Sequence, residues 1–192
     1  MKRGGSHLRI ANHQMTWLIT GGAGYIGSHV VDYFFNKKES IIVMDNLLSG
    51  SRLNIEGKCT FIEGDISDKS ILQEIFINHE IEGVVNLAAL KSVSESALIP
   101  EEYRRINSIA AANLINESVK HGLDIFVQSS TAAVYGNLDS GIAREDSELA
   151  PISVYGKTKV EAEIALSRQV SQKKIKGISI NARLKRRGKG IF

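Results

Sequence analysis

The sequence predicts an α/β fold: a doubly wound parallel sheet with helices on both of its faces. Two observations predict this class. Strand-like apolar runs alternate with helical patterns along the chain, which is typical of parallel strands joined by crossover helices. The first run, at 16–20, leads directly into a glycine-rich turn that opens a helix. The chain has 192 residues, of which 43% are hydrophobic, so it can bury one complete core.

Each element is predicted from its own pattern. Short runs rich in β-branched and other apolar residues predict six strands, at 16–20, 41–44, 59–62, 83–87, 124–128 and 178–182. Longer periodic segments between them predict four helices, at about 25–36, 68–78, 101–121 and 155–172. Ligands of such sheets bind at the carboxyl ends of the strands. We therefore expect the functional side chains there, including Asp45, Asp65, Lys91 and the hydroxyl cluster 129–131.

The glycine-rich turn predicts a dinucleotide site of the Rossmann type. Gly21, Gly24 and Gly27 follow the apolar run and have the spacing G-x-x-G-x-x-G. The first glycine allows a tight turn, the second lets the backbone approach a pyrophosphate, and the third lets helix and strand pack closely. The helix beginning near Tyr25 would present its N–H groups to the pyrophosphate. Glycines also serve ordinary loops, but the flanking strand and helix favour the nucleotide interpretation.

The next strand supplies an acidic residue in the expected place. The run 41–44 ends at Asp45, which lies 24 positions beyond Gly21. A dinucleotide fold places the acid that binds the adenosine ribose hydroxyls close to this position. The carboxylate would repel a 2′-phosphate, so NAD is favoured over NADP. The alternative is an ordinary turn aspartate in Asp45-Asn46.

A tyrosine and a lysine form the candidate proton-transfer pair. Tyr155 and Lys159 are four positions apart at the start of a predicted helix and therefore project from one face. A free tyrosine is a poor base, but a lysine ammonium and the positive nicotinamide ring would stabilise its phenolate. The hydroxyl of Thr131 could hydrogen-bond the same substrate oxygen. The alternatives are a tyrosine packed over a lysine stem and a hydroxyl-capped turn.

From Thr16 to Arg183 the chain resembles the NAD-dependent epimerase/dehydratase family of the extended short-chain dehydrogenase/reductases, and within it the UDP-glucose 4-epimerases. The resemblance rests on residues 20–29 (TGGAGYIGSH), Asp45-Asn46, 64–66 (GDI), 86–93 (NLAALKSV), 129–136 (SSTAAVYG) and 153–159 (SVYGKTK). It implies a catalytic set of Thr131, Tyr155 and Lys159. It implies adenine contacts from Asp65 and Ile66. The full cofactor-binding set is then Gly21, Gly24, Tyr25, Ile26, Gly27, Asp45, Asn46, Asp65, Ile66, Leu87, Ala88, Ala89, Lys91, Tyr155 and Lys159.

The resemblance also suggests which reaction is catalysed. Related sugar-nucleotide dehydratases carry an Asp-Glu pair after the threonine, whereas this chain has Ala132-Ala133. Epimerisation needs neither carboxylate. Tyr155 would accept the proton of the sugar 4-hydroxyl while hydride passes to NAD, and the 4-keto sugar would turn over and be reduced on its other face. UDP-galactose and UDP-glucose would be interconverted in this way.

The chain departs from the family pattern at two places. The family's paired asparagines read Ile106-Asn107 here, which removes one expected cofactor contact. After Arg183 the family's Tyr-Phe-Asn is replaced by a basic segment, as if the frame had shifted or ended early, and the sugar-nucleotide lobe is absent. We therefore expect impaired epimerase activity from this chain alone. Two alternatives stay open: a single-domain NAD-dependent oxidoreductase acting on a smaller substrate, and a non-catalytic NAD-binding module.

Composition narrows the partners. A single cysteine, Cys59, excludes an internal disulfide and a cysteine metal cluster, and it suits the reducing cytoplasm where we expect the protein. No apolar run approaches the roughly 20 residues of a membrane span. Residues 183–189 carry five positive charges without an interleaved aromatic residue, which favours a solvated tail over a nucleic-acid site. We expect no metal.

The expected domain organisation has three parts. Residues 1–14 show no clear period and are expected to be a disordered extension. Residues 15–184 would form the NAD-binding domain, and residues 185–192 an atypical basic tail. Relatives often dimerise through the two helices that correspond to 101–121 and 155–172, so a homodimer is expected to be compatible with this sequence.

Overall fold

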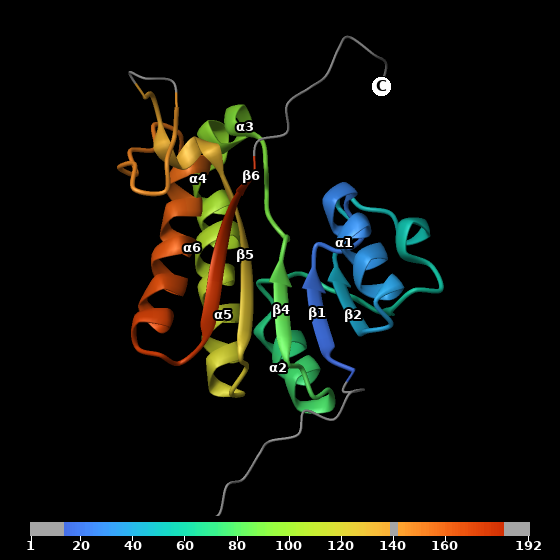
Figure 1. Ribbon diagram of the computed structural model, residues 1–192. Coiled ribbons are helices and arrows are strands. Elements are labelled where there is room, and N and C mark those ends of the chain that lie inside the picture. The colour runs from blue at the N-terminus through green and yellow to red at the C-terminus, as the bar shows by residue number, and fades with distance from the viewer. Residues whose placement is uncertain (1–13, 139–141, 183–192) are drawn as a thin grey trace, which may run out of the picture.

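The computed structural model describes residues 14–138 and 142–182, which contain one six-stranded parallel sheet (Figure 1). Its strands are β1 (Thr16–Thr20), β2 (Ser40–Asp45), β3 (Thr60–Glu63), β4 (Gly83–Asn86), β5 (Ile125–Thr131) and β6 (Lys176–Ala182). They lie in the order β3-β2-β1-β4-β5-β6, and every neighbouring pair is parallel. This order confirms the predicted fold class. The strand order reverses between β1 and β4, which is where such sheets bind ligands.

The helices fall largely where periodicity predicts them. They are α1 (Tyr25–Asn36), α2 (Lys69–Asn78), α3 (Val93–Leu98), α4 (Pro100–Tyr103), the π-helix η2 (Arg104–Ala110), α5 (Ala111–Lys120) and α6 (Val154–Ser171), with short 3-10 turns η1 (Arg52–Ile55) and η3 (Ala132–Tyr135). The single helix predicted at 101–121 is divided into α4, η2 and α5. Both η2 and α5 bury residues, so the sequence pattern does not mark the change of helix type. Helix α3 was not predicted, since six residues are too few to show a period.

Helices cover both faces of the sheet, as predicted. Strand residues such as Leu18, Val84 and Phe126 pack with side chains of α2, α5 and α6 in one apolar cluster. On the other face, Ile19 and Val43 pack with side chains of α1 and η1 in a second cluster. Because the central strands are buried on both sides, their sequences read as continuous apolar runs rather than as an alternation. Figure 1 shows α1 apart from α5 and α6, across the sheet.

Several expectations fall on residues outside the described ranges. Of the proposed N-terminal extension only residue 14 is described, and the basic segment 183–189 and tail 185–192 lie outside entirely. The expected domain boundaries therefore stay predictions. Among the described residues, no helix is long and apolar enough to cross a membrane. In the same residues no group of three or more His, Cys, Asp or Glu side chains is placed to hold a metal ion.

Candidate cofactor cleft and catalytic residues

A cleft of about 490 Å³ lies over the carboxyl ends of β1, β2 and β4, at the point where the strand order reverses. It brings together segments that follow β1, β2, β3 and β4, together with Ser129 of β5. The residues predicted from the sequence to bind cofactor, apart from Tyr155 and Lys159, all line this cleft: Gly21, Gly24, Tyr25, Ile26, Gly27, Asp45, Asn46, Asp65, Ile66, Leu87, Ala88, Ala89 and Lys91. Their contacts with a cofactor stay a prediction.

Each glycine of the turn has a different steric environment. Gly21 has a φ of +72°, and a Cβ there would lie 2.6 Å from the Ala88 nitrogen. A Cβ on Gly27 would lie 2.1 Å from the Gly21 oxygen, so the start of α1 rests directly on the turn. A Cβ on Gly24 would meet only that oxygen, at 3.4 Å. Gly21 and Gly27 are thus required for packing, whereas Gly24 leaves open space at the helix start.

The N-terminus of α1 is suited to an anion. Its N-cap residue is Gly24, no side chain caps the first turn, and that turn carries no acidic residue. The first N–H groups of a helix have no partner within the helix, and the helix dipole adds positive potential there. A phosphate group in the cleft would satisfy these donors.

Asp45 joins the end of β2 to the glycine turn. The residue is 8% exposed, and its Oδ2 accepts a hydrogen bond from the Ala23 nitrogen at 3.0 Å. Its Oδ1 accepts from the Leu47 nitrogen at 2.8 Å, so the turn that the sequence offered as an alternative is also present. A carboxylate has about four acceptor positions. Asp45 can therefore brace the turn and still accept hydrogen bonds from a ligand in the cleft.

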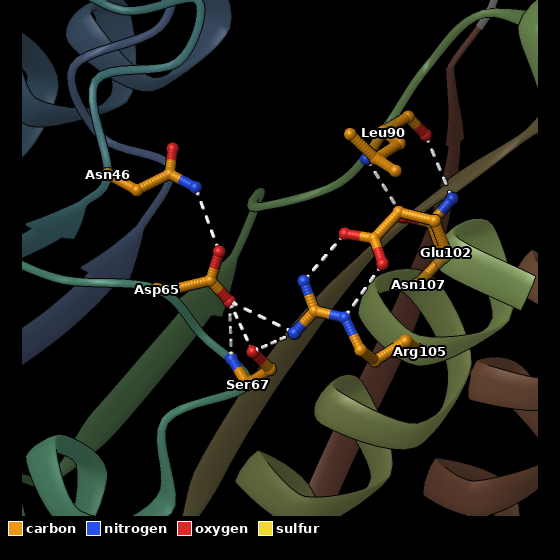
Figure 2. Close-up of polar contacts among 7 residues, drawn as sticks. All are labelled: Asn46, Asp65, Ser67, Leu90, Glu102, Arg105 and Asn107. Atoms are coloured by element: carbon orange, nitrogen blue, oxygen red, sulfur yellow. Dashed lines mark hydrogen bonds and ion pairs between the residues drawn. The ribbon is translucent and has the colours of Figure 1, made fainter. Parts of the chain in front are cut away.

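The rim beyond Asp45 is a polar network (Figure 2). Asn46 donates to Asp65 Oδ2 at 2.9 Å, and the nitrogen and hydroxyl of Ser67 donate to Asp65 Oδ1 at 2.8 and 2.6 Å. Burial raises the pKa of Asp65, but these hydrogen bonds and the charge of Arg105 outweigh it, so the pKa lies below its ordinary value. Asp65 is thus held as an anion at the edge of the cleft.

The departure at Ile106-Asn107 has a structural consequence. Ile106 is 7% exposed, lines the cleft and belongs to the core cluster on that face. Asn107 is buried, and its side chain donates to the Leu90 oxygen and accepts from the Leu90 nitrogen, both at 2.8 Å (Figure 2). Asn107 therefore anchors the segment after β4 that forms one wall of the cleft. The only sequence signal for this role is an amide on an otherwise apolar helical face.

Helix α6 carries the candidate catalytic pair to the end of β5. Ser153 caps the helix by accepting from the Gly156 nitrogen at 3.0 Å. Lys159 is 3% exposed and its Nζ donates to the Ser129 oxygen at 3.0 Å. One turn later Glu163 accepts a hydrogen bond from the Ser130 hydroxyl. Positions 155, 159 and 163 share one helical face, so Tyr155 lies on the face that meets the end of β5.

Thr131 is the last residue of β5 and lies at the same end of the strand. Its hydroxyl oxygen accepts from the Ala133 nitrogen at 3.2 Å and caps η3. A Cβ on Gly156 would lie 2.7 Å from the Ala133 oxygen, so α6 begins directly against this turn. Of β5, only Ser129 lines the cleft; Tyr155, Lys159 and Thr131 are not among its lining residues. Ser129, whose backbone oxygen accepts from Lys159, therefore connects the catalytic candidates to the lining of the cofactor cleft.

Two buried groups near this site, Lys159 and Tyr103, have shifted pKa values. Burial lowers the pKa of Lys159 to about 8, although Glu163 opposes the shift. Burial and a hydrogen bond to Glu95 raise the pKa of Tyr103 to about 12. The Tyr103 ring lies edge-on to the Tyr155 ring, with centroids 6.4 Å apart. Lys159 thus remains a cation at neutral pH, whereas Tyr103 remains a neutral phenol.

Comparison with known proteins connects this geometry to a family. The model of the NAD dependent epimerase/dehydratase family matches residues 17–183. The chain belongs to this family. The epimerase/dehydratase resemblance inferred from the sequence is thereby confirmed.

Individual epimerase/dehydratase relatives are UDP-glucose 4-epimerases. Those of Halalkalibacterium halodurans and Haemophilus influenzae are 40% and 41% identical over 149 and 157 residues, which is 78% of this chain in each case and 44% and 46% of the relatives. The chain thus spans about half the length of the curated relatives it matches.

Solved structures agree with this family. The UDP-glucose 4-epimerase of Thermotoga maritima with UDP-glucose has a TM-score of 0.84 at 36% identity, covering 87% of this chain and 55% of that one. The Thermus thermophilus enzyme in complex with NAD has a TM-score of 0.83 at 31% identity, covering 87% and 54%. The similarity therefore extends over the described fold.

The residues of this epimerase/dehydratase family member fit a dinucleotide. The uncapped start of α1 suits a pyrophosphate, and the open space at Gly24 lets the phosphates approach the backbone. The buried carboxylate of Asp45 suits ribose hydroxyls. The turn after Thr131 begins with Ala132 and Ala133 and carries no carboxylate.

Proposed function

We propose that this protein binds NAD in the cleft between β1 and β4 and carries the proton-transfer residues of a UDP-sugar 4-epimerase. One observation carries the proposal: α6 and β5 place the Tyr155–Lys159 face and Thr131 at one end of the sheet, beside a cleft lined by the predicted cofactor residues. Family membership and the relatives' activity support it.

In this proposal, different residues of the chain contact different parts of NAD. Gly21, Gly24 and the first turn of α1 hold the pyrophosphate, with Tyr25, Ile26 and Gly27. Asp45 and Asn46 hold the adenosine ribose, and Asp65 and Ile66 flank the adenine. Leu87, Ala88, Ala89 and Lys91 line the opposite wall. When bound, NAD supplies a nicotinamide ring that takes a hydride from the sugar C4 and returns it.

The catalytic residues handle the proton and the charge. The Tyr155 oxygen accepts the proton of the sugar 4-hydroxyl as the C4–H bond breaks, and it gives that proton back when the 4-keto sugar is reduced on its other face. The Lys159 ammonium offsets the negative charge on the phenolate. Thr131 hydrogen-bonds the same sugar oxygen. Ala132 and Ala133 follow it in place of the dehydratases' Asp-Glu pair, which favours epimerisation over dehydration.

Two alternatives make different predictions. A single-domain oxidoreductase would turn over a small alcohol with NAD. A non-catalytic NAD-binding module would bind NAD and convert neither substrate. Positioning of the substrate supplies much of an enzyme's rate, so even slow conversion of a UDP-sugar by this chain would support the first proposal.

The test is conversion of UDP-galactose to UDP-glucose by the purified full chain with NAD. Tyr155→Phe removes the proton acceptor but keeps the ring, so the rate is expected to fall by about 10²- to 10⁴-fold. Tyr33→Phe alters an exposed tyrosine on α1 and is the matched control. An unchanged rate in Tyr155→Phe would contradict the catalytic assignment, and NAD binding without turnover of either substrate class would favour the module.

Assembly and location belong to the same proposal. A homodimer through the η2–α5 segment and α6 is supported by two exposed apolar side chains, Ile109 (52% exposed) and Ile164 (43% exposed), on these helices. Sedimentation analysis of the purified protein tests it. A cytoplasmic location stays a prediction from the single cysteine.

A further inference from the structure

One arginine crosses the rim of the cleft. Arg105, in η2, donates to both carboxylate oxygens of Glu102, from Nε at 2.9 Å and from Nη2 at 2.6 Å. Its third nitrogen, Nη1, donates to the Ser67 hydroxyl and lies 3.9 Å from Asp65 Oδ1. Figure 2 shows the guanidinium between Glu102 on one side and the Asp65–Ser67 pair on the other. All three guanidinium nitrogens are therefore engaged.

The Arg105 contacts join η2 to the loops that follow the paired strands β2 and β3. Asn46 follows β2, Asp65 follows β3, and Arg105 lies 38 positions beyond Ser67. Asn46, Asp65 and Glu102 line the cleft. Arg105 and Ser67 do not line it but link these residues to one another. The hydrogen bonds run without a break from Asn46 through Asp65 and Ser67 to Arg105 and Glu102. One side chain thus ties η2 to the loops after β2 and β3.

An arginine suits this position because it lies between two carboxylates. Asp65 and Glu102 are both anionic at neutral pH and both line the cleft. Their carboxylates would repel each other and leave the two walls free to separate. A guanidinium has five donors in a planar fork, which lets it serve two acidic partners at once. A lysine in the same place would neutralise charge but could not form the fork.

We propose that Arg105 is a positioning residue for the adenosine half of the dinucleotide, which it acts on by holding the η2 wall and the 65–67 turn together at that end of the cleft. This inference rests on the proposed NAD site, in which Asp65 and Ile66 flank the adenine. Arg105 does not need to touch the cofactor. It sets the distance between the walls that do, and it slows the release of the adenosine end.

The test compares ligands that contain different halves of NAD. For Arg105→Ala we expect the dissociation constants of NAD and of AMP to rise about three- to tenfold, the size typical of a partly exposed charged network. The dissociation constant of nicotinamide mononucleotide is expected to stay the same. The higher dissociation constant for NAD is expected to come from faster dissociation. The difference between Arg105→Ala and the wild type is expected to be smaller at about 0.5 M salt than at about 0.05 M, because salt screens the charges of the Arg105 contacts. Arg105→Lys is expected to fall between wild type and Arg105→Ala.

Lys120→Ala is the matched control. Lys120 pairs with Glu117 at 3.2 Å, also three positions apart and on the surface, but away from the cleft. It is expected to bind NAD and AMP like the wild type, and both variants are expected to unfold at the same temperature without ligand. Wild-type affinity in Arg105→Ala would overturn the inference and leave the proposed function intact. Equal weakening for nicotinamide mononucleotide would overturn it too, since the effect would not be local. Failure of the wild type to bind NAD or AMP would overturn both.

Discussion

Lys159 has two opposing effects, one on stability and one on the site. Its side chain is almost completely buried, with one hydrogen bond to the Ser129 oxygen and a carboxylate, Glu163, near enough to oppose the pKa shift. Burying an ammonium destabilises the folded state because solvation is lost. The same burial fixes the charge at the end of β5, next to Tyr155, where a phenolate would need it. The protein thus accepts a local cost in stability at its candidate site.

This cost predicts how stability changes with pH. In the folded protein the pKa of Lys159 is about 8, below its ordinary value of 10.5. Its contribution is therefore least unfavourable above pH 10.5 and becomes fully unfavourable as the pH falls through 8. Relative to Lys159→Met, the wild type is expected to gain about 2 kcal/mol in free energy of unfolding from about pH 7 to 9.5.

Urea denaturation at both pH values measures this difference. Lys157→Met, which replaces an exposed lysine on the same helix, is expected to follow the wild type at each pH. Parallel curves for wild type and Lys159→Met would contradict the lowered pKa of Lys159.

At the level of elements, the glycine turn contains one glycine that packing requires and another that leaves space for a ligand. Gly27 has no space for a side chain because the Gly21 oxygen lies 2.1 Å from its would-be Cβ, whereas Gly24 has space and a φ of −73°. The two glycines therefore serve different purposes although they belong to one motif.

Alanine at each position is expected to give a different result. Gly27→Ala should lower the free energy of unfolding by about 2–3 kcal/mol, because α1 must move off the turn. Gly24→Ala should lower it by less than about 1 kcal/mol. It should nevertheless weaken NAD binding by about tenfold or more, because the methyl group blocks hydrogen bonding between the phosphates and the backbone.

Chemical denaturation and NAD titration of both variants measure these effects. Similar stability losses in the two would show that Gly24 is a packing residue. Unchanged NAD affinity in Gly24→Ala would show that the pyrophosphate does not approach there.

Element prediction from the sequence succeeded where packing produces a pattern. Buried strands such as β1 and β2 are continuous apolar runs, and α1 and α6 lie within a few residues of the helices predicted at about 25–36 and 155–172. The π-helix η2 and the short helix α3 were missed. Helix α3 is too short to show a period, and η2 makes contacts with a distant segment, such as the Asn107 bonds to Leu90, that no local pattern records.

For the whole molecule, the strand order decides where function can lie. Parallel strands bring the residues after β1, β2, β3 and β4 to one edge, so the motif residues that follow these strands line a single cleft. Motif residues were predictable because each follows a strand. Arg105 and Asn107 were not, since their partners lie 38 and 17 positions away and become neighbours only when η2 packs against the sheet.

The proposed function depends on an NAD site in the cleft between β1 and β4. Calorimetric titration of NAD and NADP into the purified full chain tests it most directly. We expect one NAD per chain and an affinity for NADP that is weaker by about tenfold or more, because Asp45 would face the 2′-phosphate. Absence of NAD binding, or equal affinity for the two dinucleotides, would contradict the account.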